Sequence, residues 1–400
     1  MTKLSQSAEH HAMHNLPMYS RPDVAGRQPG RLLSALVLSG FLVALLLLST
    51  GFGPPILTDR NDAPIRLSPE NIAALIQTNV PPTVTAASVL MIELPSGATL
   101  FEKASVELHP PASTAKLMTA LVVRAEVPLD DVAVITPTAA GTGGSSMGLV
   151  AGERLTVSDL LHGLLLPSGN DAAVALAEHV AGSEADFVAM MNARARAIGL
   201  QSTRFANAHG LDAPDQLTTA LDLALLASAA MQDAELASIV AKPVANVAGR
   251  ALVNTNELLS TYAGADGVKT GTTDEAGECL IAAVSRNSRR LLLVELGSSE
   301  RYEDARKLLD YAATAFAWHD VRLPQGGLSW ITASNGDAYR LRSDPTSDIF
   351  VPAWQRSLLL PVVQIDASLV LTGTEPVGRL RWQLGSELVA ETPLSIWQGP

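Results

Sequence analysis

The stretch Ala112–Ala120, ASTAKLMTA, follows two prolines and places a serine three residues before a lysine. Pro110 and Pro111 cannot continue a helix, whereas apolar residues recur at helical spacing after Lys116, so we predict a helix whose first turn contains Ser113. Residues three apart share a helix face, and the Lys116 amine can therefore reach the Ser113 hydroxyl. The stretch is either a serine cap with a solvated lysine or a nucleophile with its base, and partners elsewhere must decide between them.

The composition of the chain limits the classes of protein to which it can belong. It has 400 residues, of which 47% are hydrophobic and 17% are charged, and this is typical of a globular protein with two or three domains. The formal net charge of -12, without a long run of lysine or arginine, argues against nucleic acid as a partner. The single cysteine, Cys279, allows no intramolecular disulfide, and the histidines show no metal-ligand spacing, so we expect neither a metal nor another cofactor.

An apolar run near the N-terminus predicts attachment to a membrane. The 21 residues Leu32–Phe52 carry no charge and would span roughly 30 Å as a helix. Basic residues outnumber acidic ones in the segment 1–31, which places that segment in the cytoplasm and the remainder of the chain on the extracytoplasmic, periplasmic side. We expect a single-pass N-terminal anchor; the alternative is a cleaved signal peptide, for which Ser49-Thr50-Gly51 offers only a weak site.

The composition and residue patterns of the rest of the chain predict a stalk and two folded domains. Residues 53–79 mix prolines with charges and read as the stalk. Residues 80–320 show mixed helix and strand patterns and are predicted to form the main domain. Residues 321–400 consist of short alternating runs separated by turn residues, which predicts a small all-β domain.

Within the main domain the patterns predict a particular order of elements. Residues 86–93 and 98–102 flank a turn and should form a hairpin. Val157–Val180 should form two helices that meet at Pro167-Ser168-Gly169-Asn170, with Thr156 as the N-cap of the first. The later segments should form an antiparallel meander and then a helix; they are Gly267–Thr272, Cys279–Ser285, Arg290–Gly297 and Ala305–Ala317.

Three short motifs occur in order along this domain. They are Ser113-Thr114-Ala115-Lys116 at a helix start, Ser168-Gly169-Asn170 at a turn between helices, and Lys269-Thr270-Gly271 in a predicted strand. Each motif alone could arise by chance, and Ser285-Arg286-Asn287 shows that a Ser-x-Asn match does. The ordered occurrence of all three, each in its expected context, favours a nucleophilic serine with a lysine base.

On these motifs the chain resembles the low-molecular-mass penicillin-binding proteins, the serine-type D-alanyl-D-alanine carboxypeptidases. The resemblance covers roughly residues 80–396 and includes stretches such as PASTAKLMTALVV, GLLLPSGNDAAVALAEHVAG and GVKTGTTDEAGECLIAAV. It implies an α+β fold of the penicillin-binding and β-lactamase-like type, in which an antiparallel sheet is flanked by helices and a helical subdomain is added. The active site would lie between the sheet and that subdomain, and the small β-rich domain would follow.

The resemblance also suggests a role for each motif residue. A serine hydroxyl is a poor nucleophile near neutral pH, so Ser113 needs Lys116 as its base, and Lys116 can serve only if its pKa is lowered. Ser168 can relay a proton to the leaving amine, Asn170 can fix Lys116, and Lys269 can hold Ser168 and attract an anionic substrate. The backbone N–H groups of Ser113 and Thr272 would bind the oxyanion.

A substrate that ends in a free carboxylate needs a cation and hydroxyl groups at the far end of the cleft. Thr270 and Thr272 can supply the hydroxyl groups, next to Gly271, and we expect Arg301 to be the cation. Arg301 stands six residues before Lys307, where the family carries such an arginine, but a solvated arginine in a loop is the alternative. Thr272 replaces the histidine that many family members carry after the lysine motif.

The resulting hypothesis is an enzyme that removes the terminal D-alanine from peptidoglycan stem peptides ending in D-Ala-D-Ala and that binds β-lactam antibiotics. A class A β-lactamase would add a Glu-x-x-x-Asn after the second motif, and the sequence has none there. A D,D-endopeptidase with the same residues is not separable from a carboxypeptidase by motifs. A non-catalytic wall-binding protein of this fold is the rival from another class, but it would not be expected to keep all three motifs intact.

Overall fold

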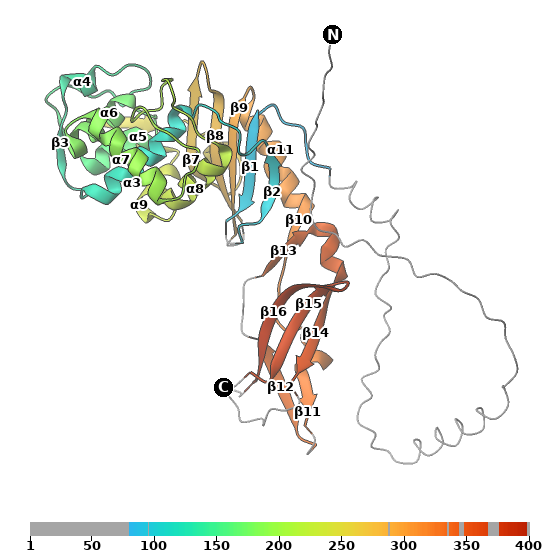
Figure 1. The fold of residues 1–400 in the computed structure, drawn as a ribbon. Coiled ribbons are helices and arrows are strands. Elements are labelled where there is room, and N and C mark those ends of the chain that lie inside the picture. The colour runs from blue at the N-terminus through green and yellow to red at the C-terminus, as the bar shows by residue number, and fades with distance from the viewer. Residues whose placement is uncertain are drawn as a thin grey trace, which may run out of the picture. The chain divides into compact units, whose positions relative to one another are not determined.

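The structure is a computed structural model, and it describes residues 80–397 apart from 95, 287–288, 334–335, 344–347 and 367–375. The main domain is built on a five-stranded antiparallel sheet with the order β2-β1-β9-β8-β7 (Figure 1). Its strands are β1 (Ser88–Glu93), β2 (Thr99–Lys103), β7 (Ala265–Thr273), β8 (Gly277–Arg286) and β9 (Arg289–Ser298). The structure thus contains the predicted hairpin and the predicted meander, and β1 joins them by pairing with β9.

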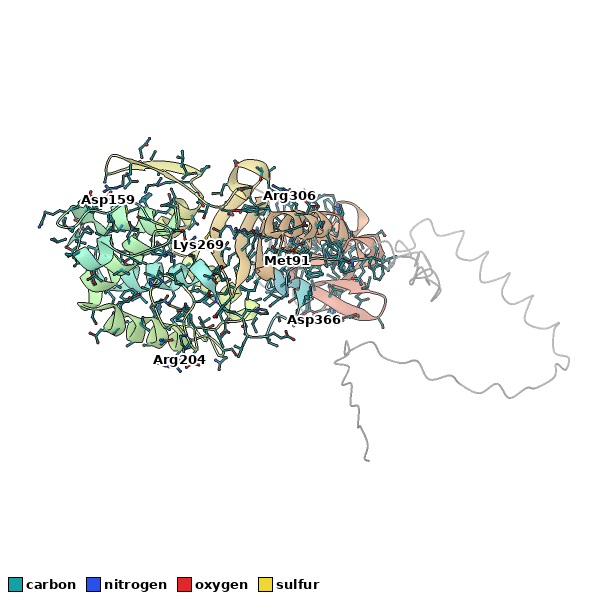
Figure 2. All side chains as sticks on the ribbon, turned by 90° about the horizontal axis from the view of Figure 1, so that it is seen from above. Met91, Asp159, Arg204, Lys269, Arg306 and Asp366 are labelled. Atoms are coloured by element: carbon teal, nitrogen blue, oxygen red, sulfur yellow. The ribbon has the colours of Figure 1, made fainter. Side chains whose placement is uncertain are left out.

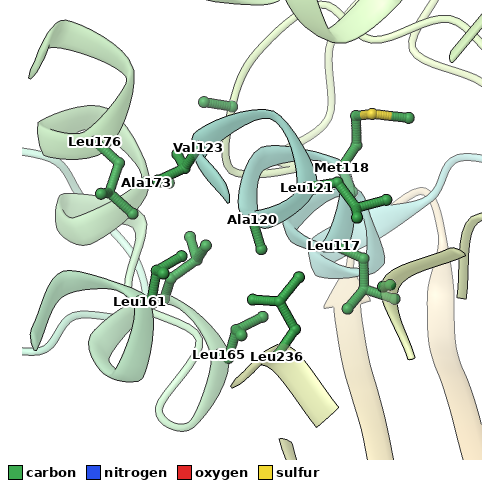
Figure 3. Close-up of a cluster of buried hydrophobic side chains, with 14 of the residues drawn as sticks. Leu117, Met118, Ala120, Leu121, Val123, Leu161, Leu165, Ala173, Leu176 and Leu236 are labelled. Atoms are coloured by element: carbon green, nitrogen blue, oxygen red, sulfur yellow. The ribbon is translucent and has the colours of Figure 1, made fainter. Parts of the chain in front are cut away.

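One face of the sheet is covered by a cluster of helices (Figure 1). The helices are the 3-10 helix η1 (Ala112–Ala115), α3 (Lys116–Glu126), α4 (Pro137–Ala140), α5 (Val157–Leu165), α6 (Asn170–Ala181), α7 (Glu184–Ala197), α8 (Ala220–Ala230) and α9 (Ala234–Val240). Figure 3 shows Leu117 and Ala120 of α3 facing Leu161 of α5 and Leu236 of α9 across the buried core. Helix α3, which carries Lys116, is therefore held in place by its neighbours over most of its length.

The opposite face of the sheet packs against α11 (Arg301–Ala315) and the short helix α10 (Leu258–Thr261). Side chains alternate between the two faces along β9, so Leu292 and Val294 face the helical cluster while Leu291 and Leu293 face α11. A sheet that is buried on both faces supports a strand of nearly continuous apolar residues, as seen here. Helix α11 begins four residues earlier than the predicted Ala305, and this places Arg301 in a helix rather than in a loop.

Helix ends in the main domain follow local sequence signals. Thr156 is the N-cap of α5, as predicted, and it forms a reciprocal capping box with Asp159. Gly182 ends α6 with φ 77°, a left-handed conformation that favours glycine. The sequence break at Pro167 separates α5 from α6, so the Ser-x-Asn motif stands at a turn between two buried helices.

Two small hairpins complete the main domain. Strands β3 (Val132–Val134) and β4 (Arg154–Thr156) pair in one, and β5 (Val244–Val247) and β6 (Arg250–Val253) pair in the other. Arg250 connects them, because its guanidinium contacts the Glu153 carboxylate at 2.7 Å and the Gly148 carbonyl at 2.9 Å. The two hairpins therefore brace the segment around Gly148, which lies next to the second motif.

The C-terminal part is all-β, as predicted, with short 3-10 turns. Its main sheet has the order β11-β12-β16-β15-β14, and Leu380, Trp382 and Leu394 are buried in its core. The first strand, β10, starts at Phe316, five residues before the expected boundary at 321. The elements are β10 (Phe316–His319), η2 (Gly327–Ser329), β11 (Trp330–Thr332), β12 (Ala338–Ser343), β13 (Ile349–Pro352), η3 (Ala353–Leu358), β14 (Leu359–Ile365), β15 (Gly378–Leu384) and β16 (Glu387–Ile396).

The predicted anchor Leu32–Phe52 and the stalk 53–79 lie outside the described residues. Among the residues that are described, no single helix has both the length and the hydropathy to cross a membrane. Helices α8 and α9 reach that threshold only when they are taken as a pair, with a bend of 111° between them.

Candidate active site

Ser113 stands at the point where the chain turns into α3. It lies in the 3-10 helix η1, directly before the α-helix that starts at Lys116, so the predicted helix start is confirmed with a tighter first turn. The preceding residue, Ala112, has φ 48°, an unusual conformation for a residue with a side chain. Such strained backbone is held only where the surroundings over-determine it, and Ala112, Thr114 and Ala115 of η1 are themselves buried.

Lys116 is fully buried and its amine donates to three acceptors. The Nζ atom lies 2.8 Å from Ser113 Oγ, 2.8 Å from Asn170 Oδ1 and 2.6 Å from the His209 carbonyl oxygen. Burial holds the pKa of Lys116 well below its ordinary value, and the Lys269 charge lowers it further, while Asp171 opposes both. Lys116 is therefore positioned to accept the Ser113 proton at a pH where a surface lysine could not.

The second motif brings a second serine and the amide to the same place. Asn170 opens α6 and binds Lys116 through its oxygen, while its nitrogen donates to the Gly143 carbonyl at 2.8 Å. Ser168 precedes it with φ 65°, and its buried Oγ has no hydrogen-bond partner in the described part of the chain. A buried hydroxyl without a partner is costly unless another molecule supplies one, so Ser168 is free to bond a bound substrate.

The third motif lies on β7, the edge strand of the sheet nearest the helices. Lys269 is buried, and Figure 2 shows it where the strands meet the helical cluster. Burial, with a smaller contribution from the Arg301 charge, lowers the Lys269 pKa to about 7. Its Nζ donates to the Thr270 carbonyl at 2.9 Å, and the structure has no hydrogen bond between Lys269 and the unpartnered Ser168 hydroxyl, although the sequence suggested that contact.

Strand β7 passes unusually close to the backbone of Ser113. A Cβ atom at Gly271 would lie 2.8 Å from the Ser113 nitrogen, and one at Gly210 would lie 2.0 Å from the Ala112 carbonyl oxygen. Only glycine fits at either position without moving the backbone. The close approach places the Ser113 nitrogen beside the strand that carries Thr272, the two residues whose backbone N–H groups the family resemblance implies as oxyanion donors.

Arg301 lies at the far end of this strand, in the first position of α11. Its NH1 atom contacts the Gly271 carbonyl at 2.7 Å, Thr272 Oγ1 at 3.0 Å and the Cys279 carbonyl at 3.2 Å. The structure therefore brings Arg301 and Thr272 together, as predicted, and the alternative of a solvated loop arginine is wrong. Arg301 is a partly buried cation that borders the lysine motif.

Thr270 has a hydroxyl partner that the motifs do not reveal. Its Oγ1 lies 2.6 Å from Thr255 Oγ1, and the Thr255 carbonyl in turn accepts a hydrogen bond of 2.6 Å from the Tyr302 hydroxyl. This chain of contacts links the motif strand to α11. Thr255 comes from the segment between β6 and α10, and only its place in the fold identifies it.

Three further residues contribute to the site through contacts that only the fold creates. Asp171 lies in the first turn of α6, and its carboxylate accepts from the backbone nitrogens of residues 147–149 at 3.0 to 3.1 Å. His209 supplies the carbonyl that binds Lys116, and its side chain has a pKa lowered to about 4 by burial and by the Lys116 charge. Glu184 accepts from the Ala208 nitrogen at 2.9 Å and lies 3.6 Å from His209 Nε2.

The site thus joins a serine, a buried lysine base, a second serine with an amide, a second buried lysine and a cation in one place. These groups suit acyl transfer: a nucleophile with a base, candidate oxyanion donors and a partner for an anionic substrate. Within the described residues, no group of three or more His, Cys, Asp or Glu side chains is arranged to hold a metal ion.

Comparison with known proteins agrees with this arrangement. The family model for D-alanyl-D-alanine carboxypeptidase matches residues 76–300. The chain is 32% identical to the D-alanyl-D-alanine carboxypeptidase DacC of Escherichia coli over 345 residues, which cover 80% of this chain and 86% of that protein. It is 36% identical to DacF of Bacillus subtilis over 249 residues, which cover 59% of this chain and 64% of DacF.

Solved structures agree as well. Penicillin-binding protein 6B from Escherichia coli matches with a TM-score of 0.64 and 31% identity, covering 78% of this chain and 96% of that chain. Penicillin-binding protein 5 from Haemophilus influenzae matches with a TM-score of 0.63 and 27% identity, covering 79% and 98%. The predicted resemblance and the predicted fold class are confirmed. On the family match and on the likeness to DacC, the chain belongs to the D-alanyl-D-alanine carboxypeptidase family of serine peptidases.

Proposed function

We propose that this protein is a serine-type carboxypeptidase that removes the terminal D-alanine from peptidoglycan stem peptides through an acyl-enzyme on Ser113. The observation that carries the proposal is the 2.8 Å contact between Ser113 Oγ and the buried Nζ of Lys116. A lysine with a lowered pKa is a competent base, and no other group needs to be recruited to activate the serine.

The first half of the reaction follows from this contact. Ser113 Oγ attacks the carbonyl carbon of the penultimate D-alanine while Lys116 takes the hydroxyl proton. The negative charge that forms on the carbonyl oxygen is met by the backbone N–H groups of Ser113 and Thr272. When the C–N bond breaks, the leaving amine receives a proton from Lys116 through the Ser168 hydroxyl, and free D-alanine departs.

The second half releases the shortened peptide. A water molecule attacks the ester carbon as Lys116 takes its proton, and the Ser113 oxygen leaves with that proton. Asn170 keeps the Lys116 amine aligned through both halves, because its side-chain oxygen binds Nζ at 2.8 Å. Lys116 therefore ends each half of the reaction in the protonation state in which it began.

The free carboxylate of the substrate is bound at the far end of the motif strand. The groups there that can pair with it are the Thr270 and Thr272 hydroxyls and the Arg301 guanidinium. Lys269, which is buried on the same strand, adds positive charge. A penicillin carries an acyl carbon and a carboxylate in a similar relation, so the same groups support its binding and the acylation of Ser113.

A direct test measures D-alanine release from a diacetyl-Lys-D-Ala-D-Ala peptide, with benzylpenicillin hydrolysis followed in parallel. The proposal predicts stoichiometric release of D-alanine and a long-lived penicillin adduct. Rapid turnover of penicillin with no release of D-alanine would instead identify a β-lactamase. Release of D-alanine from linear peptides, with no conversion of crosslinked dimers into monomers, would exclude a D,D-endopeptidase.

We further propose that the chain is anchored in the cell membrane with the enzyme on the extracytoplasmic side. The uncharged run Leu32–Phe52 and the basic excess before it support the anchor. The expected result is that the full chain sediments with membranes and resists extraction by salt, whereas it is released by detergent. A protein recovered in the soluble fraction with a new N-terminus after residue 52 would show a cleaved signal peptide instead.

A further inference from the structure

An acidic side chain lies beside the cation that we assign to the substrate carboxylate. Glu278 on β8 stands directly across from Thr272 in the pairing of β7 with β8. Its Oε2 accepts from the Arg301 backbone nitrogen at 3.0 Å, and its Oε1 lies 3.6 Å from Arg301 NH2. Glu278 therefore lies at the same end of the motif strand as Thr272 and Arg301.

The two opposite charges are not equally accessible. The Arg301 side chain is 15% exposed and its NH1 atom contacts three acceptors, whereas the Glu278 side chain is 35% exposed. This end of the motif strand thus holds a largely buried cation and a more exposed carboxylate beside it.

We propose that Glu278 is a specificity-determining residue that makes the site favour a leaving D-amino acid with a cationic side chain over one with an anionic side chain. This inference rests on the proposed function, because it concerns the residue that the enzyme would release. The leaving residue carries its own carboxylate to Arg301. Its side chain is attached one carbon away, so a charge on that side chain comes within reach of Glu278.

The distances make this discrimination electrostatic rather than a matter of direct contact. Charges that lie within about 8 to 10 Å of each other are not fully screened at physiological salt. The Glu278 carboxylate lies 3.6 Å from the Arg301 guanidinium, so a ligand bound to that guanidinium lies inside this range. A cationic side chain would be attracted and an anionic one repelled, and the two effects add when the substrates are compared.

The test uses three peptides that are identical except for the last residue, which is D-alanine, D-lysine or D-glutamate. Wild type should show a ratio of kcat/KM for D-lysine to that for D-glutamate well above one. In Glu278→Gln, which keeps an acceptor for the Arg301 backbone N–H, we expect the ratio to fall by about 5- to 30-fold. The value for the D-alanine peptide should fall little or rise, because an opposing charge near its carboxylate is removed.

Glu275→Gln is the matched control. Glu275 is an exposed glutamate in the turn between β7 and β8, so the variant makes the same change in net charge three residues away. It should alter the ratio by less than about twofold. The ratio in wild type should also shrink as salt is raised, and the ratio in Glu278→Gln should be nearly independent of salt.

Each outcome separates the inference from the function on which it rests. If wild type releases none of the three terminal residues, the proposed function fails. If wild type releases D-alanine but Glu278→Gln leaves the D-lysine to D-glutamate ratio unchanged, the inference is overturned and the function stands. Equal losses on all three peptides would also overturn it, because they would mean that Glu278 only holds Arg301 in place.

Discussion

Arg301 is the residue through which the structure most sharply changes the interpretation of the sequence, and its replacement by alanine tests the assignment of the substrate carboxylate. Arg301→Ala removes the guanidinium that contacts Thr272 Oγ1 at 3.0 Å and borders the motif strand. The substitution should not disturb the start of α11, because the Glu278 carboxylate still accepts from the backbone nitrogen of residue 301. The variant should fold as wild type does, which a thermal melt checks.

The size of the effect follows from the kind of contact that is lost. A hydrogen bond to a charged group contributes about 1.5 to 3 kcal/mol, which corresponds to roughly a 10- to 100-fold change. We expect kcat/KM for D-Ala-D-Ala peptides to fall by that factor in Arg301→Ala. Acylation by benzylpenicillin should fall less, because ring strain supplies much of its reactivity and the Thr270 and Thr272 hydroxyls remain.

The assay compares D-alanine release with the rate of penicillin acylation for wild type, Arg301→Ala and a control. Arg306→Ala is that control, because Arg306 lies on the same helix and its NH2 atom contacts only Thr261 Oγ1, at 3.1 Å, among the side chains of the described residues. It should leave both rates within about twofold of wild type. Peptide turnover in Arg301→Ala equal to that of wild type would refute the assignment, and the carboxylate partner would then have to be Lys269.

Two further substitutions test other features of the structure. Gly271→Ala should abolish acylation while the protein still folds, because the new Cβ would lie 2.8 Å from the Ser113 nitrogen. A penicillin-binding assay measures the acylation, and circular dichroism or crystallography checks the fold. Normal acylation of the variant would contradict the close approach of β7 to Ser113. Glu295 is buried, neither of its carboxylate oxygens has a hydrogen-bond partner in the described part of the chain, and burial followed by the Asp304 charge raises its pKa well above 4.5. A raised pKa in the folded state gives stability that is present at low pH and is lost as pH rises through that pKa. Glu295→Gln should therefore raise Tm more at pH 8 than at pH 5. An equal rise in Tm at both pH values would contradict the raised pKa of Glu295.

The sequence predicted the parts of the site that are local. The Ser-x-x-Lys motif reports a geometry within one helical turn, and the structure has the Ser113 and Lys116 side chains 2.8 Å apart. The N-cap at Thr156 is likewise set by neighbours in the chain, and the structure confirms it. These features can be predicted from sequence motifs because the groups that form the hydrogen bonds are only a few residues apart in the chain.

Contacts between distant segments could not be read in the same way. Two examples are the His209 carbonyl that binds Lys116 and the Thr255 hydroxyl that contacts Thr270. Both residues lie in loops, and the local sequence does not predict the path of those loops. The start of α11 was placed too late because Arg301, Glu303 and Asp304 interrupt the apolar periodicity in its first turn. Asp304 is buried there by contacts with the backbone nitrogens of Thr85 and Ala86, and such a partner is visible only in three dimensions.

Intact-mass analysis of the protein with benzylpenicillin, carried out on wild type and on Ser113→Ala, tests the central claim most directly. Ser113→Ala removes the oxygen that would carry the acyl group and leaves the rest of η1 unchanged. The account predicts a single penicilloyl adduct on wild type, located by peptide mapping to the stretch that contains Ser113, and no adduct on the variant. An adduct that forms on Ser113→Ala at the wild-type rate would place the nucleophile elsewhere and contradict the account.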